Sequence, residues 1–386
     1  MAGPSYTPIE LLARLVAFDT TSHKSNLEIV AFIEDYLLQH GITSTRITAP
    51  DGLKASLYAT IGPAGVGGIA LSGHTDVVPV DGQTWTSDPF TLRREDGKLY
   101  GRGACDMKGY LACMMAAVPD FKRRALKVPI HLAFSYDEEV GCLGVRPMIA
   151  EFGKSVQRPR LVIVGEPTSM QVVDAHKGPV RWQVEVTGRA AHSSMAHLGV
   201  NAITYAARLI AELERMEAEL RITSRNDRYE PPYATLQVTK LEGGTANNII
   251  PIFCRFGFEV RSLAGVDVDG IERRLRNFAE TACLPEMQRT APESGVSIVR
   301  ANTVPPFEAT AGSEATALAL ALTGQNETHT VSYATEAGLF QDGGAPSIVC
   351  GPGDIAQAHT PDEWIAESEI AKCMALFGRL GNWAER

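Results

Sequence analysis

Short apolar runs alternate with helix-like segments in the first part of the chain. The runs at 68–74, 129–136 and 160–166 are mainly apolar and have the length of a strand. Residues 26–41 and 107–121 instead carry apolar side chains at helical spacing. Strands that alternate with helices in this way predict an α/β fold with a mostly parallel, doubly wound sheet.

The first residues have the pattern of an amphipathic helix. Thr7 is the expected N-cap, Pro8 lies in the first turn, and Glu10 completes a Thr-x-x-Glu capping box. Glu10 and Arg14 interrupt the apolar positions, and no basic stretch precedes them. We therefore interpret this segment as a helix of the folded protein and not as a signal peptide.

The periodicity changes after residue 177. Apolar and polar residues now alternate one by one, as in strands with one buried face, and two long helical patterns lie between them. The predicted strands and helices follow in the order β-α-β-β-α-β, at 180–188, 201–220, 234–244, 252–262, 267–283 and 295–302. This order predicts a small ferredoxin-like α+β unit.

The α/β pattern returns after residue 302, with a helix at 315–322 and a strand at 346–351. We therefore expect two domains, in agreement with a length of 386 residues. The first domain is discontinuous and comprises residues 1–177 and 303–386. The second domain, residues 178–302, is inserted into it.

Charge, hydropathy and cysteine content exclude several classes of protein. The net charge of −9 argues against a nucleic-acid partner, which would require a basic face. No apolar run reaches the roughly 18 residues of a membrane span, so we expect no membrane partner. The seven cysteines are scattered and form no C-x-x-C pair. This pattern indicates reduced thiols and a cytoplasmic protein.

Side chains that bind metals follow the predicted parallel strands. Ligands gather at the carboxyl ends of such strands, so these residues should meet at one edge of the sheet. The candidates are His74, Asp76, Asp106, Asp137, Glu138, Glu139, Glu166 and His359. Two histidines and three carboxylates would suit zinc, cobalt or manganese, and two metals that share one carboxylate would use all five.

Each of these signals has an ordinary structural explanation when it stands alone. A single histidine at a strand end is usually structural, and the pair Glu138–Glu139 could lie on a solvated surface. An aspartate before a helix is usually an N-cap or first-turn residue. Their joint occurrence, with one group after each strand, favours a metal site.

Five segments of the chain resemble a known family. "SGHTDVVPV", "YGRGACDMKG", "YDEEVGCLG", "VGEPT" and "AQAHTPDEW" are similar to the signature segments of the M20 family of co-catalytic zinc amidohydrolases and peptidases. The resemblance covers essentially the whole chain. "YATEAGLFQ" and "GPGDIAQAH" resemble the acetylornithine deacetylase branch in particular.

The resemblance implies a site with two divalent ions, zinc with cobalt or manganese as alternatives. Asp106 would bridge the metals, and Glu138 would be the general base. The remaining ligands would be His74 and Glu166 for one metal, and Glu139 and His359 for the other. The resemblance also implies a cis peptide bond at Asp106–Met107.

Asp76 and His192 are expected to assist this site. Asp76 lies two residues after His74 and could accept the second ring N–H of that histidine, which fixes its tautomer. In the family, the histidine at the position of His192 stabilises the oxyanion and comes from the partner subunit. We therefore expect a homodimer formed through the inserted domain, which would act as lid and dimerisation domain.

Four further residues are candidates for substrate binding. Asn247 and Asn248 lie on a predicted turn of the lid, where their amides could contact the substrate. Arg261 follows a strand, and its guanidinium suits an α-carboxylate. Glu336 is the candidate partner of a substrate ammonium group, although a glutamate at a helix N-terminus is equally well explained by the helix dipole.

The branch implies hydrolysis of N2-acetyl-L-ornithine to L-ornithine and acetate, a step of arginine biosynthesis. The alternatives with the same chemistry are succinyl-diaminopimelate desuccinylase, another N-acyl-amino-acid hydrolase and a dipeptidase. A desuccinylase should carry an additional arginine for its second carboxylate, and none is evident. A non-catalytic binding relative is disfavoured because all five ligands and Glu138 are present.

Overall fold

The computed structural model describes residues 3–386, which form two compact units. The first unit consists of the chain up to Ala175 together with Glu308–His329 and Thr335–Arg386. The second unit consists of His176–Phe307 and the short segment Thr330–Ala334. The sequence pattern assigns this short segment to the first domain, whereas the structure places it in the second unit.

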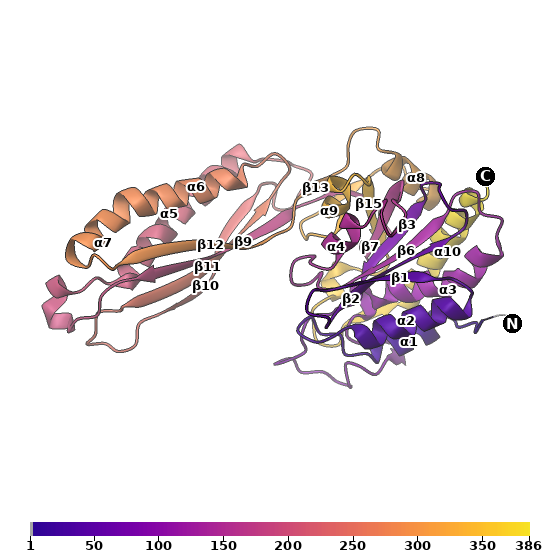
Figure 1. Cartoon of the computed structure of the whole chain (residues 1–386), viewed down its shortest axis with the longest axis horizontal. Coiled ribbons are helices and arrows are strands. Elements are labelled where there is room, and N and C mark those ends of the chain that lie inside the picture. The colour runs from indigo at the N-terminus through magenta and orange to yellow at the C-terminus, as the bar shows by residue number, and fades with distance from the viewer. Residues whose placement is uncertain (1–2) are drawn as a thin grey trace. The chain divides into compact units, whose positions relative to one another are not determined.

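A twisted nine-stranded sheet forms the centre of the first unit (Figure 1). Its path is β1-β2-β6-β3-β7-β15-β8-β13, and β14 pairs with β8. The strands are β1 Ser44–Thr48, β2 Ala55–Ile61, β3 Ile69–His74, β6 Ile130–Ser135, β7 Leu161–Pro167, β8 Val173–His176, β13 Phe307–Glu308, β14 His329–Val331 and β15 Ser347–Gly351. The central strands β6, β3, β7 and β15 are parallel, which confirms the predicted mixed α/β fold class.

Helices pack on both faces of this sheet. Side chains alternate along β2: Leu57 and Ala59 join the main core, whereas the Tyr58 ring lies on the opposite face beside Phe152. The main core includes side chains of α1 Pro8–Val16, α2 Leu27–Gln39, α3 Gly109–Arg123, α8 Glu314–Thr323 and α10 Glu367–Ala384. The shorter helices α4 Val145–Ala150 and α9 Ala337–Asp342 contact each other.

The ends of two elements refine the sequence-based expectations. The predicted capping box is present, because Thr7 Oγ1 accepts from the backbone N–H of Glu10 and the Glu10 carboxylate accepts from that of Thr7. The predicted helix at 107–121 begins at Gly109 instead. Residues Ala104–Lys108 form an irregular π-helical turn, η1, in which Asp106 and Met107 have non-helical backbone angles.

A small sheet that the periodicity does not reveal lies in the first unit. It contains three strands, β4 Arg93–Glu95, β5 Lys98–Tyr100 and β16 Trp364–Ala366, in the order β16-β5-β4. Each strand has only three residues, which is too short for a periodic pattern. The short helix η4, Ile355–Gln357, lies between β15 and β16 in the sequence.

The second unit has the predicted ferredoxin-like order. Its antiparallel sheet runs β10-β11-β9-β12, and Figure 1 shows the helices on one face of that sheet. On β9 and β11 the buried residues alternate with partly exposed ones, as a strand with one covered face requires. The elements are β9 Gly178–Thr187, η2 Ser193–Leu198, α5 Ala202–Thr223, β10 Thr235–Gly243, β11 Phe253–Ser262, α6 Val268–Phe278, η3 Ala279–Cys283, α7 Leu284–Thr290 and β12 Gly295–Thr303.

Two further expectations concern the chain as a whole. All seven cysteines are free and buried, as their scattered positions indicated. Within residues 3–386, no helix combines the length and the apolar character that crossing a membrane requires.

Candidate metal centre

His74 ends strand β3 and is almost fully buried, with 1% of its surface exposed. Its Nδ1 lies 2.9 Å from the backbone oxygen of Asp76. A carbonyl oxygen can only accept, so Nδ1 carries a proton and Nε2 is the atom that a neutral ring would offer to a metal. The Asp76 carboxylate, which we expected to be the acceptor, is farther away, with its Oδ1 at 3.4 Å. The tautomer is as expected, but the shorter contact comes from the backbone.

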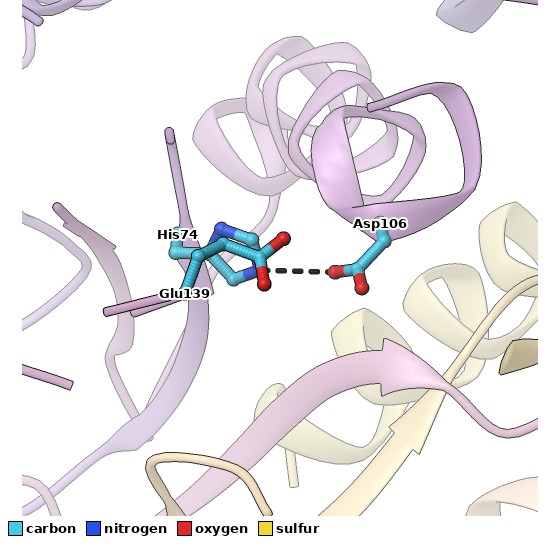
Figure 2. A group of neighbouring side chains, drawn as sticks. All are labelled: His74, Asp106 and Glu139. Atoms are coloured by element: carbon cyan, nitrogen blue, oxygen red, sulfur yellow. Dashed lines mark hydrogen bonds and ion pairs between the residues drawn. The ribbon is translucent and has the colours of Figure 1, made fainter. Parts of the chain in front are cut away.

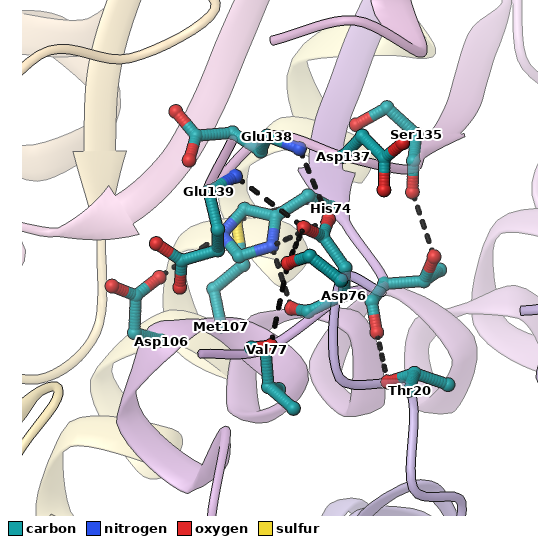
Figure 3. A network of polar contacts seen from close by, with 12 residues as sticks. Thr20, His74, Asp76, Val77, Asp106, Met107, Ser135, Asp137, Glu138 and Glu139 are labelled. Carbon is teal, nitrogen blue, oxygen red and sulfur yellow. Dashed lines mark hydrogen bonds and ion pairs between the residues drawn. The ribbon is translucent and has the colours of Figure 1, made fainter. Parts of the chain in front are cut away.

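The Asp76 carboxylate also contacts a neighbouring segment (Figure 3). It accepts hydrogen bonds from the backbone N–H groups of Glu138 and Glu139, at 3.1 and 3.3 Å, and from the Ser22 hydroxyl at 2.8 Å. His74 is paired in register with Ser135 of the adjacent parallel strand β6, so these segments leave the sheet side by side. Asp76 therefore fixes the backbone that carries both glutamates.

The two carboxylate oxygens of Asp106 face two different histidines. Oδ1 lies 3.0 Å from His74 Nε2, and Oδ2 lies 3.3 Å from His359 Nε2. Figure 2 shows Asp106 approaching His74 from turn η1, with Glu139 beside them. The peptide bond Asp106–Met107 is cis, as the resemblance implied.

Two glutamates complete a pair of ligand groups around Asp106. Glu166 Oε1 lies 3.7 Å from His74 Nε2, and Glu139 Oε1 lies 3.1 Å from His359 Nε2. Ligand atoms of His74, Asp106 and Glu139 lie within 4.8 Å of one another, so Glu139 approaches both histidines. Glu138 is also close, because ligand atoms of His74, Glu138 and Glu166 lie within 4.8 Å of one another.

The electrostatics of this cluster favour a bound cation. Burial, together with nearby carboxylates, raises the pKa of Glu138 and Glu166 well above the ordinary value and that of Glu139 to about 7. Burial also opposes ionisation of Asp106, but its hydrogen bonds with His359 and His74 lower its pKa below the ordinary value. Several buried carboxylates in one place need compensating positive charge.

The donor set fits a divalent metal. All the candidate ligands offer nitrogen or oxygen atoms, as zinc, cobalt and manganese require. Glu166 Oε1 is buried and has no hydrogen-bond partner among the described residues. An unpartnered buried carboxylate oxygen is costly, and a cation at this position would satisfy it.

The candidates in the second unit lie at opposite ends of its sheet. The His192 loop pairs with the segment that follows Asn248, since Ser193 N–H donates to the Asn248 carbonyl at 2.9 Å. Asn247, Asn248 and His192 are all exposed there. Arg261 lies near the other end of β11, where its guanidinium is 2.8 Å from the Glu259 carboxylate.

The distance between these candidates follows from the length of β11. From Phe253 to Arg261, β11 spans about 26 Å at a rise of about 3.3 Å per residue. From the sequence we expected the lid to bring Arg261, Asn248 and His192 to the metals, with His192 supplied by the partner subunit. A single rigid lid cannot place both of its ends on one small substrate.

Glu336 lies in the first unit and is buried. Its Oε2 accepts from the Ser72 hydroxyl at 3.3 Å, and its Oε1 has no hydrogen-bond partner among the described residues. Burial raises its pKa to about 7. The structure thus brings Glu336 close to strand β3 but leaves only 1% of its surface exposed.

Some residues that support the site carried no clear signal in the sequence. The Cys142 thiol donates to the Glu138 carboxylate at 3.3 Å, and the ammonium group of Lys54 pairs with Asp137. Glu363 lies in one of the signature segments, but only the structure shows its contacts with the loop that carries Asp106.

The fold and the site define a class before any comparison is made. A parallel α/β unit that gathers two histidines and several carboxylates at its strand ends is typical of a metal-dependent hydrolase. The chain belongs to peptidase family M20/M25/M40, whose family model matches residues 70–382. It is therefore an M20 family hydrolase.

The relatives include acetylornithine deacetylases of similar length. The chain is 34% identical over 381 residues to that of Proteus mirabilis, covering 97% of this chain and 96% of the relative. It is also 34% identical over 375 residues to that of Myxococcus xanthus, covering 95% of each chain.

Solved structures of M20 proteins have the same fold. An M20 metallo-carboxypeptidase from Sulfolobus solfataricus superposes with a TM-score of 0.78 at 18% identity, covering 98% of this chain and 99% of that one. A dinuclear metal-binding M20 peptidase from Bacillus subtilis gives a TM-score of 0.68 at 16% identity, with 97% and 96% coverage. At these identities the likeness concerns the fold alone.

The protonation of His359 leads to a first prediction. Hydrogen bonds to Asp106 and Glu139 raise the pKa of His359 to about 10, so the metal-free protein holds this proton at pH 8. The proton must leave before Nε2 can bind a metal. Zinc binding to the metal-free protein should therefore release a proton, and affinity should fall as the pH is lowered.

Calorimetric zinc titrations in two buffers with different ionisation enthalpies measure this release. The observed enthalpy should depend on the buffer, and the dependence should be smaller for His359→Ala. The same enthalpy in both buffers would contradict the assignment of a protonated His359.

Proposed function

We propose that this enzyme hydrolyses the amide bond of N2-acetyl-L-ornithine to give L-ornithine and acetate, as a step of arginine biosynthesis. The observation that carries the proposal is the 34% identity with acetylornithine deacetylases over nearly the full length. The two ligand groups that share Asp106 support the chemistry, because amide hydrolysis needs an activated water and a polarised carbonyl. The seven free, buried cysteines support a cytoplasmic location.

We propose that the site holds two divalent ions, zinc with cobalt or manganese as alternatives. His74 and Glu166 would bind the first, and Glu139 and His359 the second. Asp106 would bridge them, since each of its oxygens faces a different histidine. When bound, such ions lower the pKa of water and polarise an amide carbonyl.

Glu138 is proposed as the general base. Its side chain lies near the candidate ligands, and its raised pKa suits a group that exchanges protons near neutral pH. The Cys142 thiol donates a hydrogen bond to one oxygen of the Glu138 carboxylate and leaves the other oxygen available. Glu138 would take a proton from the attacking water and deliver it to the leaving amine. Asp76 would hold the backbone of Glu138 in place for both steps.

We also propose that the enzyme is a homodimer formed through the second unit, and that His192 stabilises the oxyanion in the active site of the partner subunit. The separation along β11 supports this arrangement. If Arg261 contacts a substrate bound to its own chain, then His192 and Asn248 must serve another site. A second copy of the chain provides such a site.

The substrate contacts are proposed on chemical grounds. Arg261 would bind the α-carboxylate of the substrate, which must then compete with Glu259 for the guanidinium. Asn247 and Asn248 would donate from their side-chain amides. Glu336 would pair with the side-chain ammonium of ornithine, and its unpartnered Oε1 supports that role.

The substrate proposal predicts a ranking of three amides. The value of kcat/KM should be highest for N-acetylornithine, lower for N-acetylmethionine, and lowest for N-succinyl-diaminopimelate, whose second carboxylate has no assigned arginine. A steady-state comparison at one pH and one metal concentration tests this order. A preference for the succinyl substrate would instead identify a desuccinylase, and a preference for dipeptides would identify a dipeptidase.

The base proposal predicts a separation of metal binding from turnover. Glu138→Gln should keep two metals per chain but lower kcat by about 10²–10⁴-fold, because the proton shuttle is lost. Elemental analysis and steady-state kinetics on the same sample provide the two measurements. Glu28→Gln, at an exposed position of helix α2, is the control and should behave as wild type. A nearly normal kcat for Glu138→Gln would rule out the assignment.

The dimer proposal predicts complementation between two inactive chains. Glu138→Ala and His192→Ala should each be inactive alone, and their mixture should regain activity. In a mixed dimer, one site would combine an intact Glu138 with an intact His192 of the partner subunit. Exchange of subunits is verified with a tag on one variant. Exchange without recovery would show that His192 acts within its own chain or has no catalytic role.

A further inference from the structure

A single buried carboxylate holds the loop that carries Asp106. Glu363 has 1% of its surface exposed, and its Oε1 accepts from the backbone N–H groups of Cys105 and Asp106 at 2.9 and 3.0 Å. Its Oε2 accepts from Gly103 N–H at 3.1 Å and from the Arg102 guanidinium at 2.7 Å. Four donors from one short segment therefore converge on one side chain.

The loop needs these acceptors because its backbone is irregular. Gly103 has a φ of +80°, and an added Cβ there would lie 2.7 Å from Val77 Cγ1. Asp106 and Met107 also lie outside the helical region of backbone angles. The N–H groups of residues 103, 105 and 106 lie at the start of η1, where a helix supplies no backbone acceptor of its own, and Glu363 provides the acceptors instead.

The same network extends to the loop of His359. The Arg102 guanidinium donates to the side-chain oxygen of Gln83, and Gln83 Nε2 donates to the His359 carbonyl at 2.9 Å. Arg102 Nη1 also lies 3.4 Å from the Thr360 carbonyl. A continuous chain of hydrogen bonds therefore joins the backbone of Asp106 to the backbone of His359.

His359 depends on these hydrogen bonds for its position more than His74 does. Its side chain is 49% exposed, its φ is +62°, and it lies outside the regular elements. His74 and Glu166, by contrast, belong to the buried strands β3 and β7. The hydrogen bonds of the Glu363 network reach neither of these two residues.

We propose that Glu363, acting through Arg102 and Gln83, is a positioning residue that sets the separation of Asp106 and His359. It would thereby determine the affinity of the metal site formed by Asp106, Glu139 and His359, while the site built on His74 depends on it less. This inference rests on the proposed ligand assignment. Glu363 itself would touch neither metal nor substrate, and its charge is already used by Arg102 and the loop N–H groups.

Cobalt titrations of the full-length protein test the proposal without an activity readout. Visible absorption and calorimetry report how many Co²⁺ ions bind and how tightly each is held. Gln83→Met removes the link to the His359 carbonyl at a partly exposed position, so the fold should be retained. We expect one Co²⁺ to bind as in wild type and the second to bind about 10–100-fold more weakly, as is typical for the loss of an outer-shell contact.

Three further variants define the result. Glu363→Gln should weaken the second ion at least as much as Gln83→Met, and circular dichroism shows whether this variant folds. His359→Ala gives the reference for loss of the second site. Glu367→Gln removes an exposed ion pair with Arg94 in the same part of the chain and should bind two ions normally.

The outcomes separate the two proposals. If the wild-type chain binds fewer than two ions, the proposed two-metal site is wrong. A second outcome is that the wild-type chain binds two ions while Gln83→Met and a folded Glu363→Gln bind both ions as tightly as the wild type does. In that case the positioning role is wrong and the proposed function stands. Equal weakening of both ions would also overturn the inference, because it would indicate general destabilisation. If Glu363→Gln does not fold, Gln83→Met decides.

Discussion

The concentration of buried negative charge at the ends of β3, β6 and β7 is the constraint on which the first unit depends. Carboxylates that are removed from water remain ionised only when donors or cations surround them. The two histidines and the backbone N–H groups supply part of this compensation, and Glu166 Oε1 has no hydrogen-bond partner among the described residues. The parallel strands, whose carboxyl ends meet at one edge, bring these charges together.

The protein supports the two sides of this cluster by different means. On one side, His74 and Glu166 belong to strands that are buried along their whole length, so the sheet itself positions them. On the other side, Glu139 and His359 lie in loops, and polar side chains position their backbones. Asp76 does so for Glu139, and the network of Glu363, Arg102 and Gln83 does so for His359. Of these two means of support, the buried strands allow less movement than the hydrogen-bonded loops.

The sequence was most informative where periodicity and chemistry coincide. The apolar runs before His74 and Glu166 are long enough to identify strands, and their carboxyl ends then place both residues at one edge. The cis bond at Asp106 and the proposed role of Glu138 as base could be named only through the family resemblance. The separation of Arg261 from Asn248 is implicit in the predicted strand at 252–262, but a sequence does not show which end of a strand faces a site. The shorter contact of His74 with the backbone oxygen of Asp76 could not be foreseen, because a backbone oxygen leaves no trace in the sequence.

The short segment Thr330–Ala334 shows that the second unit is built from two separate pieces of the chain. Because it belongs to the second unit while its flanking residues belong to the first, the chain passes between the units four times. The Ser332 hydroxyl donates to the Glu230 carbonyl at 2.5 Å, and the Ser332 carbonyl lies 3.4 Å from the Arg261 guanidinium. Residues 178–302 are therefore not a self-contained insertion. Exchange of this unit between relatives would have to include both pieces, since a swap at two junctions would leave Arg261 beside a foreign backbone.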